Sequence, residues 1–278
     1  MTNPTDTNQA SEVLQGDCLE LMKDIPDGSV DMILADLPYG TTACKWDTII
    51  PFEPLWEQYK RVIKPNGAIV LTASQPFTSA LVMSNPKMFR YSWVWKKQPT
   101  MFQHSKNRPM QATEDILIFS INPWGHKAQL KERRMNYFPQ GAKIGAVKKF
   151  HGVQGKYIGE RPNQVGKEYT TMTGFPSNFL DIPRESKNIH PTQKPVALFE
   201  YLIKTYTSVG DVVLDNVAGS GTTGVACQNL NRNFILMEQE PEYVEIIKQR
   251  LELNKERLTK LEAEVKPVAT PPNKKEEV

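Results

Sequence analysis

The sequence has few cysteines and no long apolar run, and each shortage excludes a class of protein. Its 278 residues include only Cys18, Cys44 and Cys227. These form no metal-ligand pattern, so we predict no metal site, and they suit a reducing compartment. No apolar stretch approaches the roughly 20 residues that cross a bilayer, and the polar start of the chain lacks the apolar core of a signal peptide. We therefore expect a cytoplasmic protein without a membrane partner.

A strong overall charge is also missing, but the charges are unevenly distributed. The net charge of +3 is too small to identify a partner. Between Lys96 and Lys187, however, 16 Lys and Arg residues face 7 Asp and Glu residues. A basic middle in an otherwise mildly acidic chain indicates a polyanion-binding surface in that segment. The alternative is a solvent-exposed, lysine-rich loop.

Apolar runs alternate with helical periodicities on both sides of this segment. This alternation predicts an α/β fold with a mainly parallel sheet covered on both faces. Residues 122–189 break the pattern with Gly, Pro, Lys, Arg and isolated aromatics, and they are too many for a plain connection. The expected strands cover Val13–Gln15, Val30–Ala35, Ala68–Thr72, Tyr91–Trp95, Ile116–Ile121, Val212–Asp215 and Phe234–Met237. A first helix is expected after Gly16-Asp17-Cys18 and ends at about Asp24. The other expected helices cover Pro54–Ile63, Pro76–Met83, Val196–Tyr206, Thr222–Leu230 and Pro241–Glu264.

The final predicted helix is longer than a typical globular helix. Its length suggests that the far end packs on a partner chain, and a homodimer is one such arrangement. Residues 265–278 have the composition of a disordered tail.

The turn after Val30–Ala35 has the residues needed to bind a flat polar ring. The carboxylate of Asp36 can accept hydrogen bonds from an exocyclic amino group, and Tyr39 can stack on the ring face. Pro38 restrains Leu37 to an extended conformation, which fixes the direction of the Leu37 carbonyl. The alternative is an ordinary exit from a strand into a loop.

A glycine-rich turn follows Val212–Asp215 and opens a helix at Thr222. Gly219 and Gly221 allow close backbone approach and positive φ. The next strand ends at Glu238, about 20 residues on, where an acid commonly accepts hydrogen bonds from ribose hydroxyls. A third glycine and a Walker lysine are both missing, which disfavours NAD and ATP. S-adenosylmethionine fits a nucleoside-containing ligand without a pyrophosphate.

Four motifs in one order carry a family resemblance. They are Gly16–Leu21, the tetrad Asp36-Leu37-Pro38-Tyr39, the stretch His190–Pro195, and Ala218-Gly219-Ser220-Gly221. The tetrad resembles the catalytic (Asp/Asn/Ser)-Pro-Pro-(Tyr/Phe/Trp) motif of amino-group DNA methyltransferases, and the glycine turn resembles their cofactor loop. The catalytic motif comes first, the basic insertion next and the cofactor loop last, which is the permuted β-type arrangement.

The resemblance implies a Rossmann-like methyltransferase fold in three parts. The catalytic half covers residues 12–121, an inserted target-recognition region covers 122–189, and the cofactor-binding half covers 190–264. The implied activity is methyl transfer from S-adenosylmethionine to the N6 amino group of adenine in double-stranded DNA, with the target base flipped out. Asp36 favours adenine, because N4-cytosine members of the family usually carry Ser at this position.

Three other functions stay open at this point. They are N4-cytosine methylation, methylation of RNA or of a protein amide, and a catalytically silent DNA-binding module of the same fold.

The resemblance also assigns roles to individual residues. The implied catalytic residues are Asp36, Leu37, Pro38 and Tyr39. The implied cofactor-binding residues are Asp17, Cys18, Asp36, Thr192, Lys194, Asp215, Ala218, Gly219, Ser220, Gly221, Thr222 and Glu238. The candidate DNA-binding residues are Lys131, Arg133, Arg134, Lys143, Lys148 and Lys149.

Within these roles, Asp17 is expected near the cofactor adenine and Glu238 at its ribose, with Thr192 and Lys194 at its methionine end. A solvent-exposed loop lysine is the alternative for Lys194, and His190 is expected to be a structural turn residue.

The chain departs from the family pattern at two places. Leu37 replaces the first proline of the tetrad, and Asn216-Val217 replaces the common Pro-Phe before the cofactor loop.

The methyltransferase hypothesis depends on one spatial prediction. The turn at Asp36 and the turn at Gly219 must lie side by side at one edge of the sheet.

Overall fold

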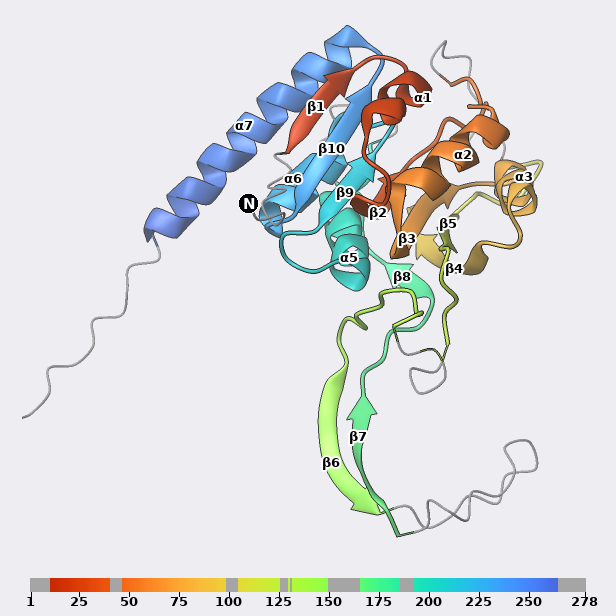
Figure 1. The fold of residues 1–278 in the computed structure, drawn as a ribbon, viewed down its shortest axis with the longest axis vertical. Coiled ribbons are helices and arrows are strands. Elements are labelled where there is room, and N and C mark those ends of the chain that lie inside the picture. Colours follow the sequence, from red (N-terminus) through yellow and green to blue (C-terminus); the bar gives the residue numbers. More distant parts are fainter. Residues whose placement is uncertain are drawn as a thin grey trace, which may run out of the picture.

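The computed structural model describes residues 11–40, 47–98, 105–125, 130, 132–149, 166–185 and 193–264. Within these residues, eight strands form one sheet in the order β1-β10-β9-β2-β3-β5-β4-β8, and β6 and β7 form a separate ribbon (Figure 1). Four sequence-based predictions fall outside the described residues: those for Lys131, His190, Thr192 and the tail 265–278.

The bounds of the elements are as follows. The strands of the sheet are β1 (Glu12–Gln15), β2 (Val30–Ala35), β3 (Ile63–Ala73), β4 (Phe89–Lys96), β5 (Thr113–Phe119), β8 (Phe179–Asp181), β9 (Val212–Asp215) and β10 (Asn233–Glu238). The ribbon consists of β6 (Lys143–Lys149) and β7 (Glu168–Thr173). The helices are α1 (Cys18–Leu21), the 3₁₀ helix η1 (Met22–Asp24), α2 (Phe52–Val62), α3 (Phe77–Ser84), α5 (Val196–Tyr206), α6 (Thr222–Asn229) and α7 (Pro241–Glu264).

The predicted α/β fold with a mainly parallel sheet is confirmed. Neighbouring strands from β1 to β3 are parallel, and β4 is parallel to β8. Only β5 runs against its two neighbours, β3 and β4. Parallel strands need crossover connections, and the helices supply them on both faces of the sheet.

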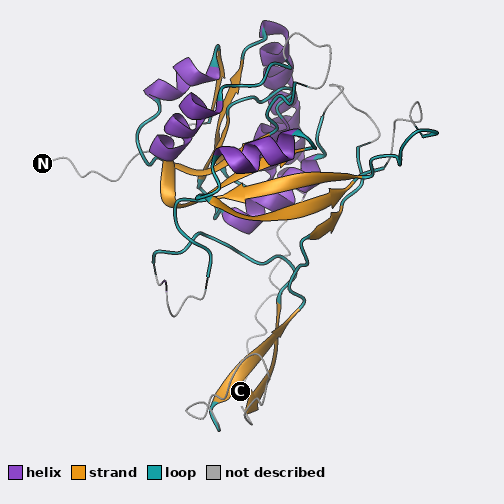
Figure 2. Cartoon of the chain, turned by 90° about the vertical axis from the view of Figure 1, so that its right-hand side faces the viewer, coloured by secondary structure: helices purple, strands orange, loops and turns teal. Residues whose placement is uncertain are grey.

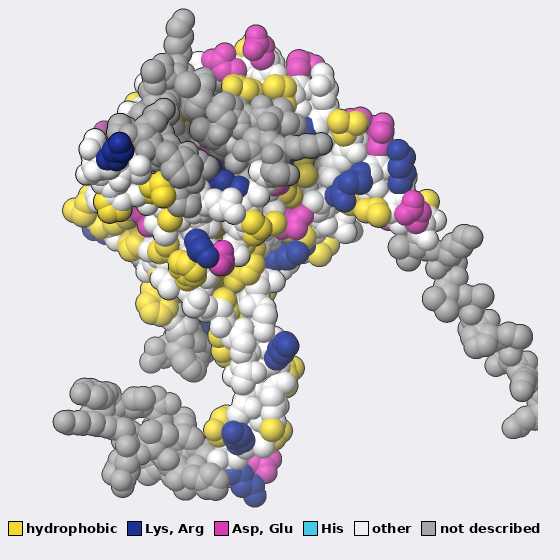
Figure 3. All heavy atoms as spheres, turned by 180° about the vertical axis from the view of Figure 1, so that it is seen from behind, with side chains coloured by type: hydrophobic (Ala, Val, Ile, Leu, Met, Phe, Trp, Pro, Cys, Tyr) yellow, Lys and Arg dark blue, Asp and Glu magenta, His cyan; other side chains and the backbone are white. Residues whose placement is uncertain are grey.

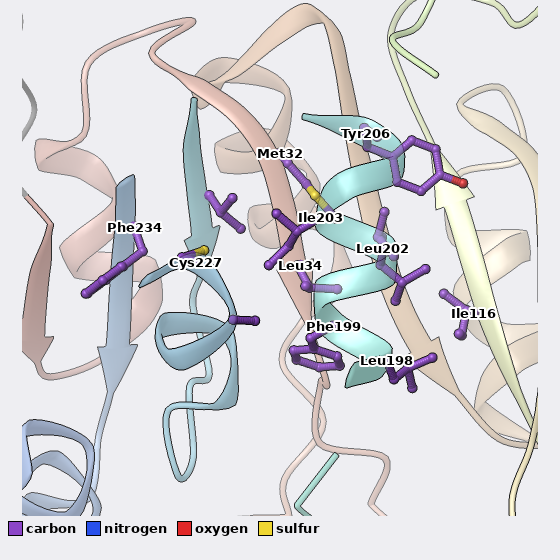
Figure 4. Packing of buried hydrophobic residues seen from close by; sticks show 14 of the residues in the cluster. Met32, Leu34, Ile116, Leu198, Phe199, Leu202, Ile203, Tyr206, Cys227 and Phe234 are labelled. Atoms are coloured by element: carbon purple, nitrogen blue, oxygen red, sulfur yellow. The ribbon is translucent and has the colours of Figure 1, made fainter. Parts of the chain in front are cut away.

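Two apolar cores lie on the two faces of the sheet, and β2 shows how one strand supplies both. Successive side chains of a strand point to opposite faces. Met32 and Leu34 therefore pack with α5, α6 and α7 (Figure 4), whereas Ile33 and Ala35 pack with α1, α2 and α3. Because both faces are covered, the strand reads as a nearly continuous apolar run rather than an alternating one.

Strand β3 begins five residues earlier than the sequence predicted. The predicted helix ended at Ile63 and the predicted strand began at Ala68, but Ile63 pairs with Val30, and the register then jumps to Ala68 opposite Met32. The jump leaves an irregular stretch in which a Cβ on Gly67 would lie 2.6 Å from the carbonyl oxygen of Asp31. Glycine is required there by close backbone approach, and not by the end of a helix.

Strand β5 also differs from its prediction, because it ends at Phe119 rather than at Ile121. Ile121 is exposed at the surface.

The segment predicted as an insertion contributes to the main body at both of its ends. Met135 is buried in the core beside α5, and β8 pairs with β4 through Val94 and Phe179. Among the described residues of this segment, the β6–β7 ribbon projects from the body (Figure 2). The glycine-rich and lysine-rich composition of the segment did not reveal these strands, which are short and exposed.

Helix α7 packs on the sheet through its first half. Val244, Ile247 and Leu251 are buried, whereas Leu253 and Leu261 are exposed. Leu261 lies in the far half of the helix, for which packing on a partner chain stays a prediction. None of the helices in the described ranges is long and apolar enough to cross a membrane.

Candidate functional site

The carboxyl ends of the parallel strands bring the two predicted turns together. In β2 and β9, Ile33 lies opposite Leu214, so the residues that follow each strand leave the sheet side by side. The register Gln15 opposite Glu238 adds the ends of β1 and β10 to the same edge. The spatial prediction is therefore confirmed. Both turns lie just beyond the carboxyl ends of the strands, which is where α/β sheets commonly bind ligands.

The carboxylate of Asp36 is held by three side chains. One oxygen accepts hydrogen bonds from the Tyr39 hydroxyl, at 2.8 Å, and from the Thr72 hydroxyl. The other oxygen lies 2.5 Å from the ammonium nitrogen of Lys194. Thr72 comes from β3, where the pairing of Ala35 with Leu71 places it beside Asp36. Asp36 is thus fixed by residues from three separate segments of the chain.

Lys194 also contacts a second carboxylate, that of Glu114. Its nitrogen lies 2.9 Å from Glu114, and Lys97 lies 2.7 Å from the other oxygen of Glu114. Burial alone would raise the pKa of Glu114, but Lys194 and Lys97 outweigh burial and lower it to about 2. Burial likewise opposes the charge of Lys194, and Asp36 and Glu114 outweigh it, so the pKa of this lysine is raised. The alternative of a solvent-exposed loop lysine is wrong, since Lys194 is only 8% exposed.

Tyr39 is a structural partner of Asp36 in this arrangement. Its ring stacks on Phe77 with 5.1 Å between centroids, and the Lys194 nitrogen lies 5.9 Å from the ring centroid. Burial, followed by the negative charges of Asp36 and Glu114, raises the pKa of the Tyr39 hydroxyl well above its usual value. The hydroxyl therefore stays protonated and remains a hydrogen-bond donor to Asp36.

Leu37 has a packing role that explains one departure from the family motif. Its side chain is buried in the core on the α1–α2–α3 face. A leucine fills this core, and its backbone carbonyl is still present at the edge of the sheet.

The glycine turn is shaped by its own backbone and by Asp215. Gly219 and Gly221 have φ of 54° and 78°, in the left-handed region that favours glycine. The Asp215 carboxylate accepts hydrogen bonds from the Thr223 hydroxyl and, at 3.2 Å, from the Val217 amide. Burial raises the pKa of Asp215 to about 7. Asp215 was predicted to bind the cofactor, and the structure shows that its buried carboxylate braces the turn.

Glu238 and Cys18 contact the residues of this turn, and Asp17 caps the helix that begins at Cys18. Glu238 accepts a hydrogen bond from the Gly219 amide at 2.8 Å, and burial raises its pKa. Asp17 caps α1 by accepting from the Leu19 amide at 2.8 Å, as an N-cap acid does. The Cys18 sulfur accepts from the side-chain amide of Asn216 at 3.4 Å.

Asn216, where the family commonly has proline, is itself buried. Its side-chain oxygen accepts a 2.6 Å hydrogen bond from Tyr59. This second departure from the family pattern therefore has a local reason, because Asn216 joins the start of α1 to α2.

An arginine from α7 forms hydrogen bonds with the residues of the glycine turn. Arg250 donates to the Ser220 carbonyl at 2.8 Å and to the Thr222 hydroxyl at 3.2 Å. The Thr222 hydroxyl lies 3.4 Å from the backbone oxygen of Lys194, to which it donates. Ser220 and Thr222 were predicted as cofactor residues, and in the structure both are buried partners of Arg250.

Sequence reasoning missed four side chains of this edge: Thr72, Lys97, Glu114 and Arg250. Glu114 had one usable signal, because Glu114 and Asp115 form an acidic pair directly before the apolar run 116–119. The direction of β5 carried no signal, and only an antiparallel β5 brings the start of that strand to this edge.

The candidate DNA-binding residues fall into two groups. Arg133 and Arg134 lie next to the buried Met135, on the body of the protein. The three lysines at positions 143, 148 and 149 are exposed on β6, where Figure 3 shows basic and apolar side chains on the ribbon. The structure thus distributes these residues over two separate surfaces.

Comparison with known proteins places these observations in a family context. The family model described as DNA methylase, of the N6/N4 type, matches residues 30–249. The chain is 32% identical to the DNA adenine methyltransferase YhdJ of Escherichia coli (strain K12), over 88% of this chain and 84% of that protein. It is 28% identical to the type II methyltransferase M.HpaI of Haemophilus parainfluenzae, over 84% of this chain and 72% of that one.

Two solved structures are similar to the fold. The M1.HpyAVI–SAM complex is 26% identical with a TM-score of 0.57, covering 86% of this chain and 99% of that one. The PvuII DNA methyltransferase, which is cytosine-N4-specific, has a TM-score of 0.61 over 90% of this chain and 94% of that one. At 16% identity, the second match is evidence for the fold alone.

Proposed function

Because this chain belongs to the N6/N4 DNA methylase family, we propose that it transfers a methyl group from S-adenosylmethionine to the N6 amino group of adenine in double-stranded DNA. The observation that carries the proposal is the adjacency of the Asp36 turn and the Gly219 turn, which leave neighbouring strands at one edge of the sheet. The similarity to a named DNA adenine methyltransferase supports adenine as the target.

The residues around the glycine turn fit a nucleoside ligand. Glu238 provides a carboxylate for ribose hydroxyls, and Asp17 follows two residues after Gln15, which pairs with Glu238. A Cβ built on Gly219 meets no atom within 4 Å, so the space above this residue is open. Bound there, S-adenosylmethionine would supply a methyl group that is already activated for transfer. The remaining task of the protein is to orient the amino group that accepts the methyl group.

In this proposal, the Asp36 carboxylate accepts a hydrogen bond from the target amino group. An adenine amino nitrogen is a poor nucleophile, because its lone pair is delocalised into the ring. Hydrogen bonds from the amino group to the Asp36 carboxylate and the Leu37 carbonyl would shift the nitrogen toward tetrahedral geometry and expose the lone pair. Asp36 acts through orientation and charge stabilisation, and no cysteine nucleophile is required.

The target base must leave the duplex to reach Asp36, because its amino group is inaccessible in a stacked helix. Contacts between basic side chains and the DNA backbone would offset the few kcal/mol that base flipping costs. The β6–β7 ribbon suits this role, because a two-stranded ribbon fits the DNA major groove. Its lysines are exposed, and we propose them, together with Arg133 and Arg134, as DNA contacts.

Mass spectrometry of nucleosides tests the proposal directly. PCR-amplified bacterial genomic DNA carries no methylated bases and is incubated with the protein and S-adenosylmethionine. We expect N6-methyladenine in the digest. Formation of N4-methylcytosine alone would overturn the assignment to adenine. No methylated base at all would favour a silent DNA-binding module, and preferential labelling of RNA in a competition would favour an RNA substrate.

A further inference from the structure

Lys194 links two carboxylates that belong to the other half of the chain. It lies just before α5, yet its ammonium nitrogen is 2.5 Å from Asp36 and 2.9 Å from Glu114. Both carboxylates come from residues before the ribbon, at the end of β2 and the start of β5. The side chains of Lys194 and Glu114 are only 9% and 5% exposed. This contact therefore holds the two halves of the methylase fold together at the carboxylate that the proposed reaction uses.

The four charges at this point balance. Asp36 and Glu114 are countered by Lys194 and Lys97, and the Lys97 side chain is 14% exposed. Buried charges are tolerated when they are paired, and removing one partner leaves the other uncompensated. Loss of Lys194 alone would leave two carboxylates in a buried site with one cation. Loss of Lys194 and of the Glu114 charge together would restore the balance.

We propose that Lys194 and Glu114 are positioning residues of the methyl transfer. Lys194 orients the Asp36 carboxylate for the target amino group, and Glu114, itself held by Lys97, keeps Lys194 in place. The inference rests on the proposed function, since it assumes that Asp36 receives the amino group. Neither residue needs to touch the reacting atoms.

The backbone of Lys194 extends this role to the second substrate. Its carbonyl oxygen accepts from the Thr222 hydroxyl at 3.4 Å, and Thr222 is bound by Arg250 beside the glycine turn. A single residue thus contacts the Asp36 corner through its side chain and the glycine turn through its backbone. The relative position of the two turns sets the distance between methyl donor and acceptor, so a small displacement is costly.

The sequence suggested a different role, in which Lys194 binds the carboxylate of the methionine part of the cofactor. The two roles make opposite predictions for cofactor affinity. A positioning residue for Asp36 affects the rate at saturation, whereas a cofactor ligand affects the dissociation constant of the cofactor. Measuring both quantities separates the roles.

The experiment compares the parent protein with Lys194→Met, Glu114→Gln, the double variant Lys194→Met/Glu114→Gln, and the control Lys96→Met. Lys96 pairs with Asp181 at 2.8 Å near the same edge, but that pair is mostly exposed and lies outside the buried cluster. The kcat and KM are measured with saturating S-adenosylmethionine and PCR-amplified genomic DNA. The dissociation constant of S-adenosylmethionine is measured by calorimetry without DNA, which also shows that each variant is folded.

We expect Lys194→Met to lower kcat about 100-fold, with changes in KM for DNA and in cofactor affinity of less than about threefold. Glu114→Gln should lower kcat about tenfold, since Lys194 keeps its contact with Asp36. The double variant should be no less active than Lys194→Met, because Glu114 acts through Lys194 and the two losses are therefore not additive. The control Lys96→Met should match the parent protein in kcat at saturating DNA and in cofactor affinity.

Two results would overturn the proposal. One is a large loss of cofactor affinity in Lys194→Met with kcat unchanged at saturation. The other is a double variant about tenfold less active than Lys194→Met, because additive losses would mean that Glu114 acts independently of Lys194. An inactive parent protein that still binds S-adenosylmethionine would instead contradict the proposed function, and the two failures are therefore distinguishable.

Discussion

Polar side chains bind one another at the carboxyl edge of the sheet, whereas on the β6–β7 ribbon they are exposed to solvent. At the edge, Asp36, Glu114 and Lys194 bind one another, and among the described residues no buried side-chain nitrogen or oxygen lacks a partner. On the ribbon, Ile144 is 82% exposed and Val147 is 62% exposed, with the exposed Lys143 and Lys148 beside them in the sequence. The edge is organised before any substrate arrives, whereas the ribbon presents side chains that have little contact with the rest of the protein.

The ribbon has two faces of different chemistry. Directly paired residues of a ribbon point to the same face. Ile144 lies opposite Met172, and Lys148 lies opposite Tyr169. The register shift between Ile144 and Val147 keeps Val147 on the face of Ile144, since its partner Thr170 is two residues from Met172. One face therefore carries Ile144, Val147 and Met172 together with the Lys149–Glu168 pair, and the other carries Lys143, Lys148 and Tyr169. In the major groove, apolar side chains contact thymine methyl groups and lysines contact phosphates.

The comparison predicts that a change at the edge abolishes the reaction without loss of binding. We expect Asp36→Ala to lower kcat by about 10²- to 10³-fold, the loss typical of removing one group that stabilises charge in the transition state. DNA affinity, measured by fluorescence anisotropy, should stay within a few-fold of the parent. Asp181→Asn is the control, because this acid lies at the end of β8 near the same edge and outside the cluster. A loss of DNA affinity as large as the loss of rate would contradict the separation of the two regions.

The paired charges at the edge predict a dependence of stability on pH. The pKa of Glu114 is lowered to about 2 in the folded protein, from 4.5 in the unfolded chain. A lowered pKa stabilises the fold above the unfolded value, and this contribution of about 3 kcal/mol is lost as the pH falls from about 4.5 toward 2. The free energy of unfolding of the parent should therefore fall more steeply over this interval than that of Glu114→Gln. Urea titrations at several pH values measure the difference, and parallel slopes would contradict it.

The ribbon should behave as an electrostatic contact that is separate from catalysis. Replacing Lys143, Lys148 and Lys149 by Ala should reduce the slope of log K against log salt by about 0.9 for each lysine that touches a phosphate. The kcat at saturating DNA should not change. Lys248→Ala in α7 is the control, since Lys248 is also an exposed lysine but pairs with Glu245 within its own helix. An unchanged salt slope would remove the ribbon lysines from the DNA interface.

The two regions also differ in how far the sequence predicts them. The strand that ends at Asp36 and the turn at Gly219 were predictable, because apolar runs and glycines are local signals. Glu114 was not, because its place at the edge depends on the antiparallel direction of β5. The strands of the ribbon were missed as well, since β6 and β7 bury almost nothing and have no clear alternation. Local patterns thus identify a site, and long-range pairing decides which other side chains complete it.

The smallest expected effect concerns the glycine turn, and it tests whether its shape serves the cofactor. Gly221→Ala forces a residue with a side chain into φ of 78°, where its Cβ would lie 3.1 Å from Ile247 of α7. The left-handed conformation costs about 1–2 kcal/mol, and the contact with Ile247 adds to that cost. Gly210→Ala is the matched control. Its φ is 85° and nothing lies within 4 Å of the added Cβ, but it precedes β9 at the opposite end of that strand. Both variants should lower the thermal midpoint of unfolding, since both impose backbone strain. Only Gly221→Ala should weaken S-adenosylmethionine binding in calorimetry, by about tenfold, because only this residue lies in the turn that the cofactor would contact. Equal loss of cofactor affinity in both variants would mean that the affinity follows global stability rather than the local shape of this turn.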